Sequence, residues 1–151
     1  MKFTIENLSS IFPLEIPKTL QTENDYGDVN ETHAFVGVAW KDVTSEILQK
    51  DFEVACFFSP EAMRYFLPAY ILLSQAKPEA IKLPLDYLFF MMQFTENEDW
   101  MKSRNDIWCN LTAAQMQLVK DWLAWFQKTP YAEEHSNLPK AVERMNKIIR
   151  T

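Results

Sequence analysis

The chain has 151 residues, of which 48% are hydrophobic, and its formal net charge at pH 7 is −6. This size and composition fit one compact domain that buries roughly two thirds of the surface of its unfolded chain. Gly27 and Gly37 are the only glycines, which excludes P-loop and dinucleotide-binding loops because these need unobstructed backbone amides at several neighbouring positions.

Composition also limits where the protein works and what it binds. Cys56 and Cys109 form no CxxC pair, and the N-terminal residues lack the apolar core of a secretory signal. No apolar run approaches the roughly 18 residues of a membrane span. The acidic balance opposes nucleic-acid binding, which needs clustered lysine and arginine. We therefore expect a reduced, cytoplasmic protein that contacts neither membrane nor nucleic acid, and whose charged partner is a basic protein.

The first predicted element is a short helix over residues 3–12. Thr4 can cap it, Phe3 and Leu8 have the spacing of a hydrophobic staple, and Pro13 ends it. From residue 13 to 41 the helical periodicity fails, which predicts a long irregular segment that contains one short helix or strand. Its charges between Lys18 and Lys41 are all acidic: Glu23, Asp25, Asp28 and Glu31.

The next two predicted helices cover residues 43–50 and about 59–75. Asp42 is the expected cap of the first. The second begins with Ser59 as N-cap, Pro60 at the first helical position and Glu61 in the first turn. Apolar residues then occupy nearly every direction around its axis, which is typical of a helix surrounded by others. We expect it to be the central core helix, bent at Pro68.

Three further helices complete the prediction. The apolar residues 84–94 form one, and an acidic stretch follows them with Glu96, Glu98, Asp99 and Trp100. Thr112 and Gln115 make a capping box at the start of the helix over residues 112–128. An apolar stripe from Leu138 to Ile149 marks the last helix. The expected fold is an all-α, single-domain bundle of five to six helices spanning residues 1–151.

Pro68 raises the question of a site inside the central helix. It removes one helical hydrogen bond and crowds the carbonyl of Arg64, which packing around a bent helix can explain. In a functional interpretation, the bend presents Arg64, Tyr65 and Tyr70 to an anion or a peptide. Arg64 also follows Glu61 by three residues, so an ion pair within the helix is available.

Catalytic and metal-binding patterns are weak. His33 and His135 are the only histidines, they fall in stretches without predicted structure, and no carboxylate or nucleophile stands near them at a motif spacing. A dyad with Cys56 or Cys109 would have to be assembled by the fold. No HExxH or CxxC pattern is present. We expect no catalytic residues, no metal and no cofactor.

Two segments resemble a known family. SPEAMRYFLPAY at residues 59–70 and LTAAQMQLVKDWLAWF at residues 111–126 are similar to small, mostly bacterial proteins that share a domain of unknown function. The likeness lies in the Ser-Pro-Glu-Ala start, the Arg-Tyr-Phe-Leu-Pro-Ala core, Tyr70, Gln115 and Trp40. The resemblance implies an all-helical single domain and supplies no reaction. Small acidic proteins of this kind are sometimes immunity proteins, which block a toxin of the same cell.

The leading hypothesis is a non-enzymatic, immunity-type inhibitor that binds a basic toxin or effector. Its predicted contact residues are Glu23, Asp25, Asp28, Glu31, Glu96, Glu98, Asp99 and Trp100. One alternative is a small-ligand or enzymatic site beside Pro68, carried by Arg64, Tyr65 and Tyr70. Another is a structural subunit of a larger assembly, for which an exposed apolar face on the last helix would be the sign.

Overall fold

The computed structural model describes residues 2–21 and 31–148, and within these ranges the architecture is a bundle of seven α-helices. The helices are α1 (Ile5–Ser9), α2 (Ser45–Lys50), α3 (Pro60–Ala76), α4 (Lys82–Met92), α5 (Glu98–Trp108), α6 (Ala113–Gln127) and α7 (Leu138–Lys147). Four short 3₁₀ turns lie between them: η1 (His33–Phe35), η2 (Trp40–Asp42), η3 (Val54–Cys56) and η4 (Ala132–Glu134). The predicted all-α class is confirmed.

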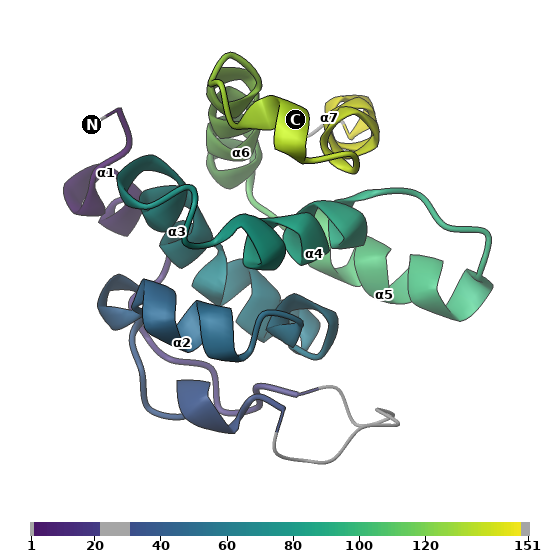
Figure 1. Cartoon of the computed structure of the whole chain (residues 1–151). Helices are drawn as coiled ribbons and strands as arrows, with labels where there is room; N and C mark the ends of the chain where they lie inside the picture. Colours follow the sequence, from purple (N-terminus) through teal and green to yellow (C-terminus); the bar gives the residue numbers. More distant parts are fainter. Residues whose placement is uncertain (1, 22–30, 149–151) are drawn as a thin grey trace.

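Helices α3 and α4 organise the bundle. Helices α6 and α7 lie side by side on one side of α4, and α2 lies on the opposite side (Figure 1). Helix α5 packs against α3 and α4, and its first turn projects from the edge of the molecule together with the α4–α5 connection (Figure 1). No helix within the described ranges has both the length and the apolar character needed to cross a membrane.

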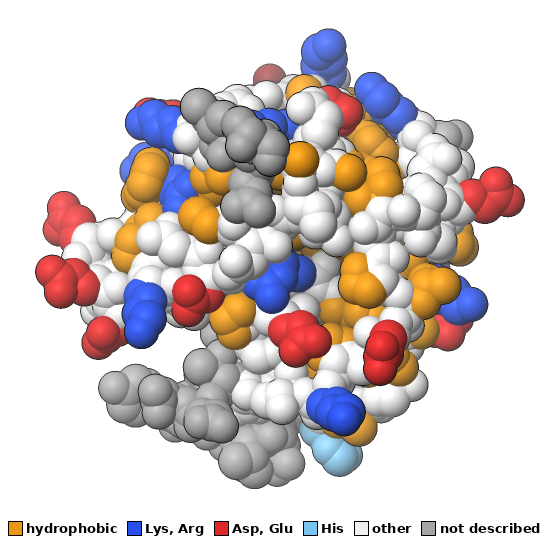
Figure 2. Space-filling view, turned by 180° about the vertical axis from the view of Figure 1, so that it is seen from behind, with side chains coloured by type: hydrophobic (Ala, Val, Ile, Leu, Met, Phe, Trp, Pro, Cys, Tyr) orange, Lys and Arg blue, Asp and Glu red, His pale blue; other side chains and the backbone are white. Residues whose placement is uncertain are grey.

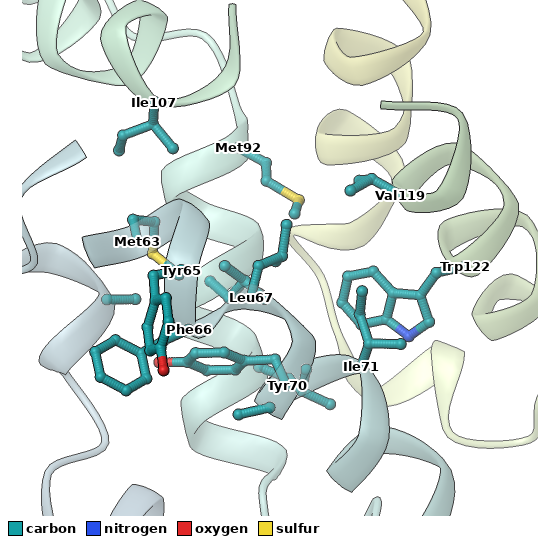
Figure 3. Packing of buried hydrophobic residues seen from close by; sticks show 14 of the residues in the cluster. Met63, Tyr65, Phe66, Leu67, Tyr70, Ile71, Met92, Ile107, Val119 and Trp122 are labelled. Carbon is teal, nitrogen blue, oxygen red and sulfur yellow. The ribbon is translucent and has the colours of Figure 1, made fainter. Parts of the chain in front are cut away.

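The central position predicted for α3 is confirmed by its burial. The Ser59 hydroxyl accepts a hydrogen bond from the backbone N–H of Ala62 at 3.1 Å, and Pro60 occupies the first turn. Pro68 is buried inside the helix, which continues past it to Ala76; a bend at this point stays a prediction. The side chains labelled around it in Figure 3 are Met92 from α4, Ile107 from α5, and Val119 and Trp122 from α6.

Polar contacts between distant segments hold the N-terminal part of the chain on this core. The Gln75 side chain accepts a hydrogen bond from the backbone N–H of Phe3 and donates one to its carbonyl, both at 2.8 Å. The indole of Trp40 donates to the carbonyl of Pro13 at 3.0 Å. The described parts of the predicted irregular segment therefore pack against the core. Phe35 on η1, for example, is completely buried.

Several predicted boundaries needed correction. Helix α2 begins after Thr44, whose hydroxyl accepts from the N–H of Ile47, whereas Asp42 ends turn η2. Helix α5 was missed, which is why the count is seven rather than five or six. The buried face of α5 includes Arg104, and this charge interrupts the apolar stripe by which a helix is recognised. The capping box of α6 at Thr112 and Gln115 is confirmed.

Candidate functional site

The most distinctive surface lies where α4 ends and α5 begins. We call it the aromatic–acidic tip and define it by Phe90, Phe94, Glu96, Glu98, Asp99 and Trp100. The Asn97 side chain starts α5 by accepting a hydrogen bond from the backbone N–H of Trp100 at 3.0 Å. This cap fixes the direction of the first turn, and Trp100 is left 55% exposed. Phe94 is equally exposed, and Phe90 is also on the surface.

The acidic part of the tip is open to solvent. Glu96, Glu98 and Asp99 are all exposed, and none belongs to either ion pair found among the described residues, which join His135 to Asp86 and Lys147 to Glu143. In Figure 2, which views the molecule from behind, acidic side chains stand on the projecting left edge, close to hydrophobic ones. Carboxylates in a first helical turn also stabilise the helix through its dipole, so their position alone proves no recognition.

Two buried arginines support the aromatic part of the tip from beneath. The guanidinium of Arg104 lies 4.6 Å from the ring centroid of Phe90 and donates a hydrogen bond to the carbonyl of Gln93 at 2.9 Å. The guanidinium of Arg144, from α7, lies 4.5 Å from the ring centroid of Phe94. Burial lowers the pKa of Arg104. Cation–π contacts of this kind hold the two rings in place. The two arginines therefore fix the positions of the phenylalanine rings at the tip.

Only some of the predicted protein-binding residues lie close together in the structure. Glu96, Glu98, Asp99 and Trp100 lie together at the tip. Glu31 is partly buried just before η1. The remaining predicted residues, Glu23, Asp25 and Asp28, lie outside the described residues. The exposed tryptophan expected at position 100 is confirmed.

The three residues beside Pro68 do not converge on an open site. Arg64 donates hydrogen bonds to the carbonyls of Asp106 and Ile107, at 2.6 and 3.3 Å, and so joins α3 to α5. The expected ion pair with Glu61 is not one of the two found in the described part of the chain. Burial lowers the pKa of Arg64, whereas the nearby charges of Glu61 and Asp106 act to raise it.

Both tyrosines are closed to solvent. The hydroxyl of Tyr65 donates to the carbonyl of Leu14 and accepts from the N–H of Trp40, each at 3.3 Å. Tyr70 is fully buried, its hydroxyl has no hydrogen-bond partner among the residues described, and burial raises its pKa. These contacts explain Tyr65 and Tyr70 as packing residues of α3, with Tyr65 also fastening the N-terminal segment.

The fold assembles one acid–imidazole pair that sequence reasoning missed. His135 Nδ1 lies 2.6 Å from a carboxylate oxygen of Asp86, which is 49 positions earlier in the chain. As predicted, His135 lies outside the helices, directly after η4, but it is only 2% exposed. The rings of Phe89 and Phe126 pack against the imidazole, and Nε2 has no partner in the described structure. A base closed off in this way cannot reach a substrate.

The remaining reactive groups are dispersed. His33 is exposed on η1, and the partly buried Cys56 has a pKa raised to about 11 by burial. A thiol with this pKa is protonated at neutral pH and is a poor nucleophile. Within residues 2–21 and 31–148, no three His, Cys, Asp or Glu side chains are grouped in a way that suits a metal ion.

Residues 18–147 match the model of a protein family described as a family of unknown function, DUF6714. The chain belongs to this family. The matched region of this DUF6714 protein includes α3 and the whole aromatic–acidic tip, and the expected membership in a family of unknown function is confirmed. No curated protein and no solved structure matches the chain. The description of DUF6714 names no activity.

Proposed function

We propose that the protein is a non-enzymatic, cytoplasmic protein-binding domain that holds a basic protein partner at the aromatic–acidic tip. The observation that supports this most is the exposed pair Trp100 and Phe94, flanked by three solvent-open carboxylates on a projecting edge. Tryptophan is enriched among the residues that dominate binding energy in interfaces. Carboxylates around it attract a basic surface and speed its association.

In its most specific form the partner is a basic toxin or effector, and the protein is an immunity-type inhibitor that neutralises it. The acidic balance of the chain, with a net charge of −6, supports electrostatic steering towards such a partner. Tight and fast binding suits an inhibitor that must act before the toxin does. The acidic residues predicted at Glu23, Asp25, Asp28 and Glu31 would add to the same field.

The test begins with purification of the tagged full-length protein from its native cells at low salt, followed by identification of the basic proteins that it retains. The partner is then purified, and its association rate is measured for two double variants. The first, Glu98→Gln with Asp99→Asn, neutralises the tip. The second, Glu133→Gln with Glu134→Gln, neutralises two exposed carboxylates of η4 as a matched control.

We expect the tip variant to slow association about tenfold at low salt, and the control variant to change it less than twofold. The effect should shrink as salt is added, because screening weakens steering. For an immunity-type inhibitor, co-expression of the protein should also restore growth to cells that produce the partner. Equal rates for the two variants, or no basic partner at all, would refute the proposal.

No observation specifically supports either of the two alternative functions. The residues of a ligand site beside Pro68 include two buried tyrosines. A structural subunit would show an exposed apolar face on the last helix. The stripe of α7 instead packs against α4 and α6, with Leu138, Ala141 and Met145 buried.

A further inference from the structure

A groove of about 600 Å³ lies beside the tip, between the α4–α5 connection, α5 and α7. Its size falls within the range of small-molecule sites. Among the described residues that line it, Phe94, Met101 and Ile148 are apolar, and the charged side chains, Arg144 and Lys147, are both basic. A basic groove is unexpected in a chain whose net charge is −6.

Arg144 is a lining residue of this groove that neighbouring side chains hold in place. It is only 5% exposed, yet neither ion pair in the described part of the chain contains it. Its guanidinium carbon lies 4.5 Å from the ring centroid of Phe94, and Nη2 donates a hydrogen bond to the side-chain oxygen of Asn105. Removing a cation from water is unfavourable unless an opposite charge compensates. The guanidinium is thus held by these two contacts and has no carboxylate partner among the described residues.

Lys147 supplies the second charge from the next turn of α7. Its ammonium is 5.6 Å from the centroid of Phe94 and 3.3 Å from a carboxylate oxygen of Glu143. Both members of this pair are largely exposed, so the pair is weak and leaves Lys147 available to another anion. Lys120 lies close by, because its ammonium donates to the carbonyl of Ile148 at 2.7 Å. Arg144 and Lys147 therefore line the groove, and Lys120 adds a third positive charge near Ile148.

We propose that this groove binds a small amphipathic organic anion. The acidic group, a carboxylate or a phosphate, pairs with Arg144 and Lys147, and the apolar body packs on Phe94 and Met101. An arginine held in place by stacking suits planar or tetrahedral oxyanions. This binding activity is additional to the proposed recognition of a basic protein: it shares Phe94 with the tip but depends on the cationic residues Arg144 and Lys147, which lie outside it.

The experiment follows amide signals of the ¹⁵N-labelled full-length protein by NMR during titration with three probes that share one chain length. Octanoate and octyl phosphate carry the two candidate acidic groups, and octyl glucoside is the neutral control. We expect the two anions to shift the signals of Phe94, Asn105 and Lys147, and at least one of them to bind more than tenfold more tightly than octyl glucoside. The tighter of the two identifies the acidic group.

Two lysine variants of α7 test whether the anionic probes bind in the groove itself. Lys147→Gln removes a lining charge, whereas Lys140→Gln removes an exposed charge of α7 that does not line the groove. The first should weaken binding of the better anion about tenfold, and the second less than twofold. Equal effects, equal affinity for the neutral probe, or no shifts at millimolar probe would overturn the proposal and leave Arg144 as a packing residue for Phe94.

Discussion

Removal of the Asp86 carboxylate should destabilise the fold through His135. In Asp86→Ala the buried imidazole loses its 2.6 Å partner, and its other nitrogen already has none among the described residues. An unsatisfied buried polar group costs about 1–3 kcal/mol. We expect the free energy of unfolding to fall by about 2 kcal/mol, which lowers Tm by about 4–8 °C in a domain of this size.

His135→Phe provides the matched comparison. Phenylalanine also carries a flat ring, somewhat larger than the imidazole but apolar, and it can pack between the rings of Phe89 and Phe126, whose centroids lie 5.3 and 5.5 Å from that of His135. Asp86 is partly exposed and can be hydrated when its partner is gone. We therefore expect His135→Phe to cost less than about 1 kcal/mol, because no buried polar group is left unpaired.

Urea unfolding followed by tryptophan fluorescence measures the two single variants and the double variant. If the pair acts as proposed, Asp86→Ala has almost no further effect when His135 is already phenylalanine, and the coupling energy is about 1–2 kcal/mol. Additive effects, or an Asp86→Ala variant within about 0.5 kcal/mol of the unmodified protein, would refute the reasoning. The carboxylate would then have no role in keeping the imidazole in the core.

Two further predictions test other contacts of the fold. Gln75→Ala breaks both hydrogen bonds to the Phe3 backbone, so it should reduce the free energy of unfolding by about 2 kcal/mol. The control Gln49→Ala breaks one exposed hydrogen bond to the carbonyl of Ala80 and should reduce it by less than about 1 kcal/mol. Equal urea midpoints for the two variants would contradict this expectation. In a Cys109→Ser variant, Cys56 should react with iodoacetamide at pH 8 roughly 100-fold more slowly than a thiol of pKa 9.0, because burial raises its pKa to about 11. The rate should keep rising to about pH 11, and a plateau near pH 9 would contradict the raised pKa.

The elements that could be predicted from sequence are those whose signals are local. Ser59 and Pro60 mark the start of α3, and Thr112 with Gln115 marks the start of α6; each signal depends on contacts within four residues. Helix α5 escaped notice although Asn97, Glu98 and Asp99 form a proper helix start. The sequence showed only an acidic stretch here, because the buried Arg104 interrupts the apolar stripe by which a helix is recognised.

The candidate site could be predicted only in part, for the same reason. Trp100 stands out within an acidic stretch, so its exposure was foreseeable. The roles of Phe94 and Arg144 depend on a contact between segments 50 residues apart, and no periodicity encodes such a contact. The pairing of Asp86 with His135 likewise arises from the packing around α4 and η4 and has no motif spacing. For the aromatic part of the tip, the i, i+4 spacing of Phe90 and Phe94 near the end of an apolar helix was a usable signal.

Binding of the purified basic partner to Trp100→Ala is the most direct test that the aromatic–acidic tip is a recognition surface. Leu14→Ala, which truncates a side chain that is 57% exposed elsewhere, is the control. We predict that Trp100→Ala raises Kd by about 30-fold or more with an unchanged Tm, as expected for loss of about 2 kcal/mol at a dominant contact, and that Leu14→Ala changes Kd less than twofold. An unchanged Kd for Trp100→Ala would contradict a binding role for the tip.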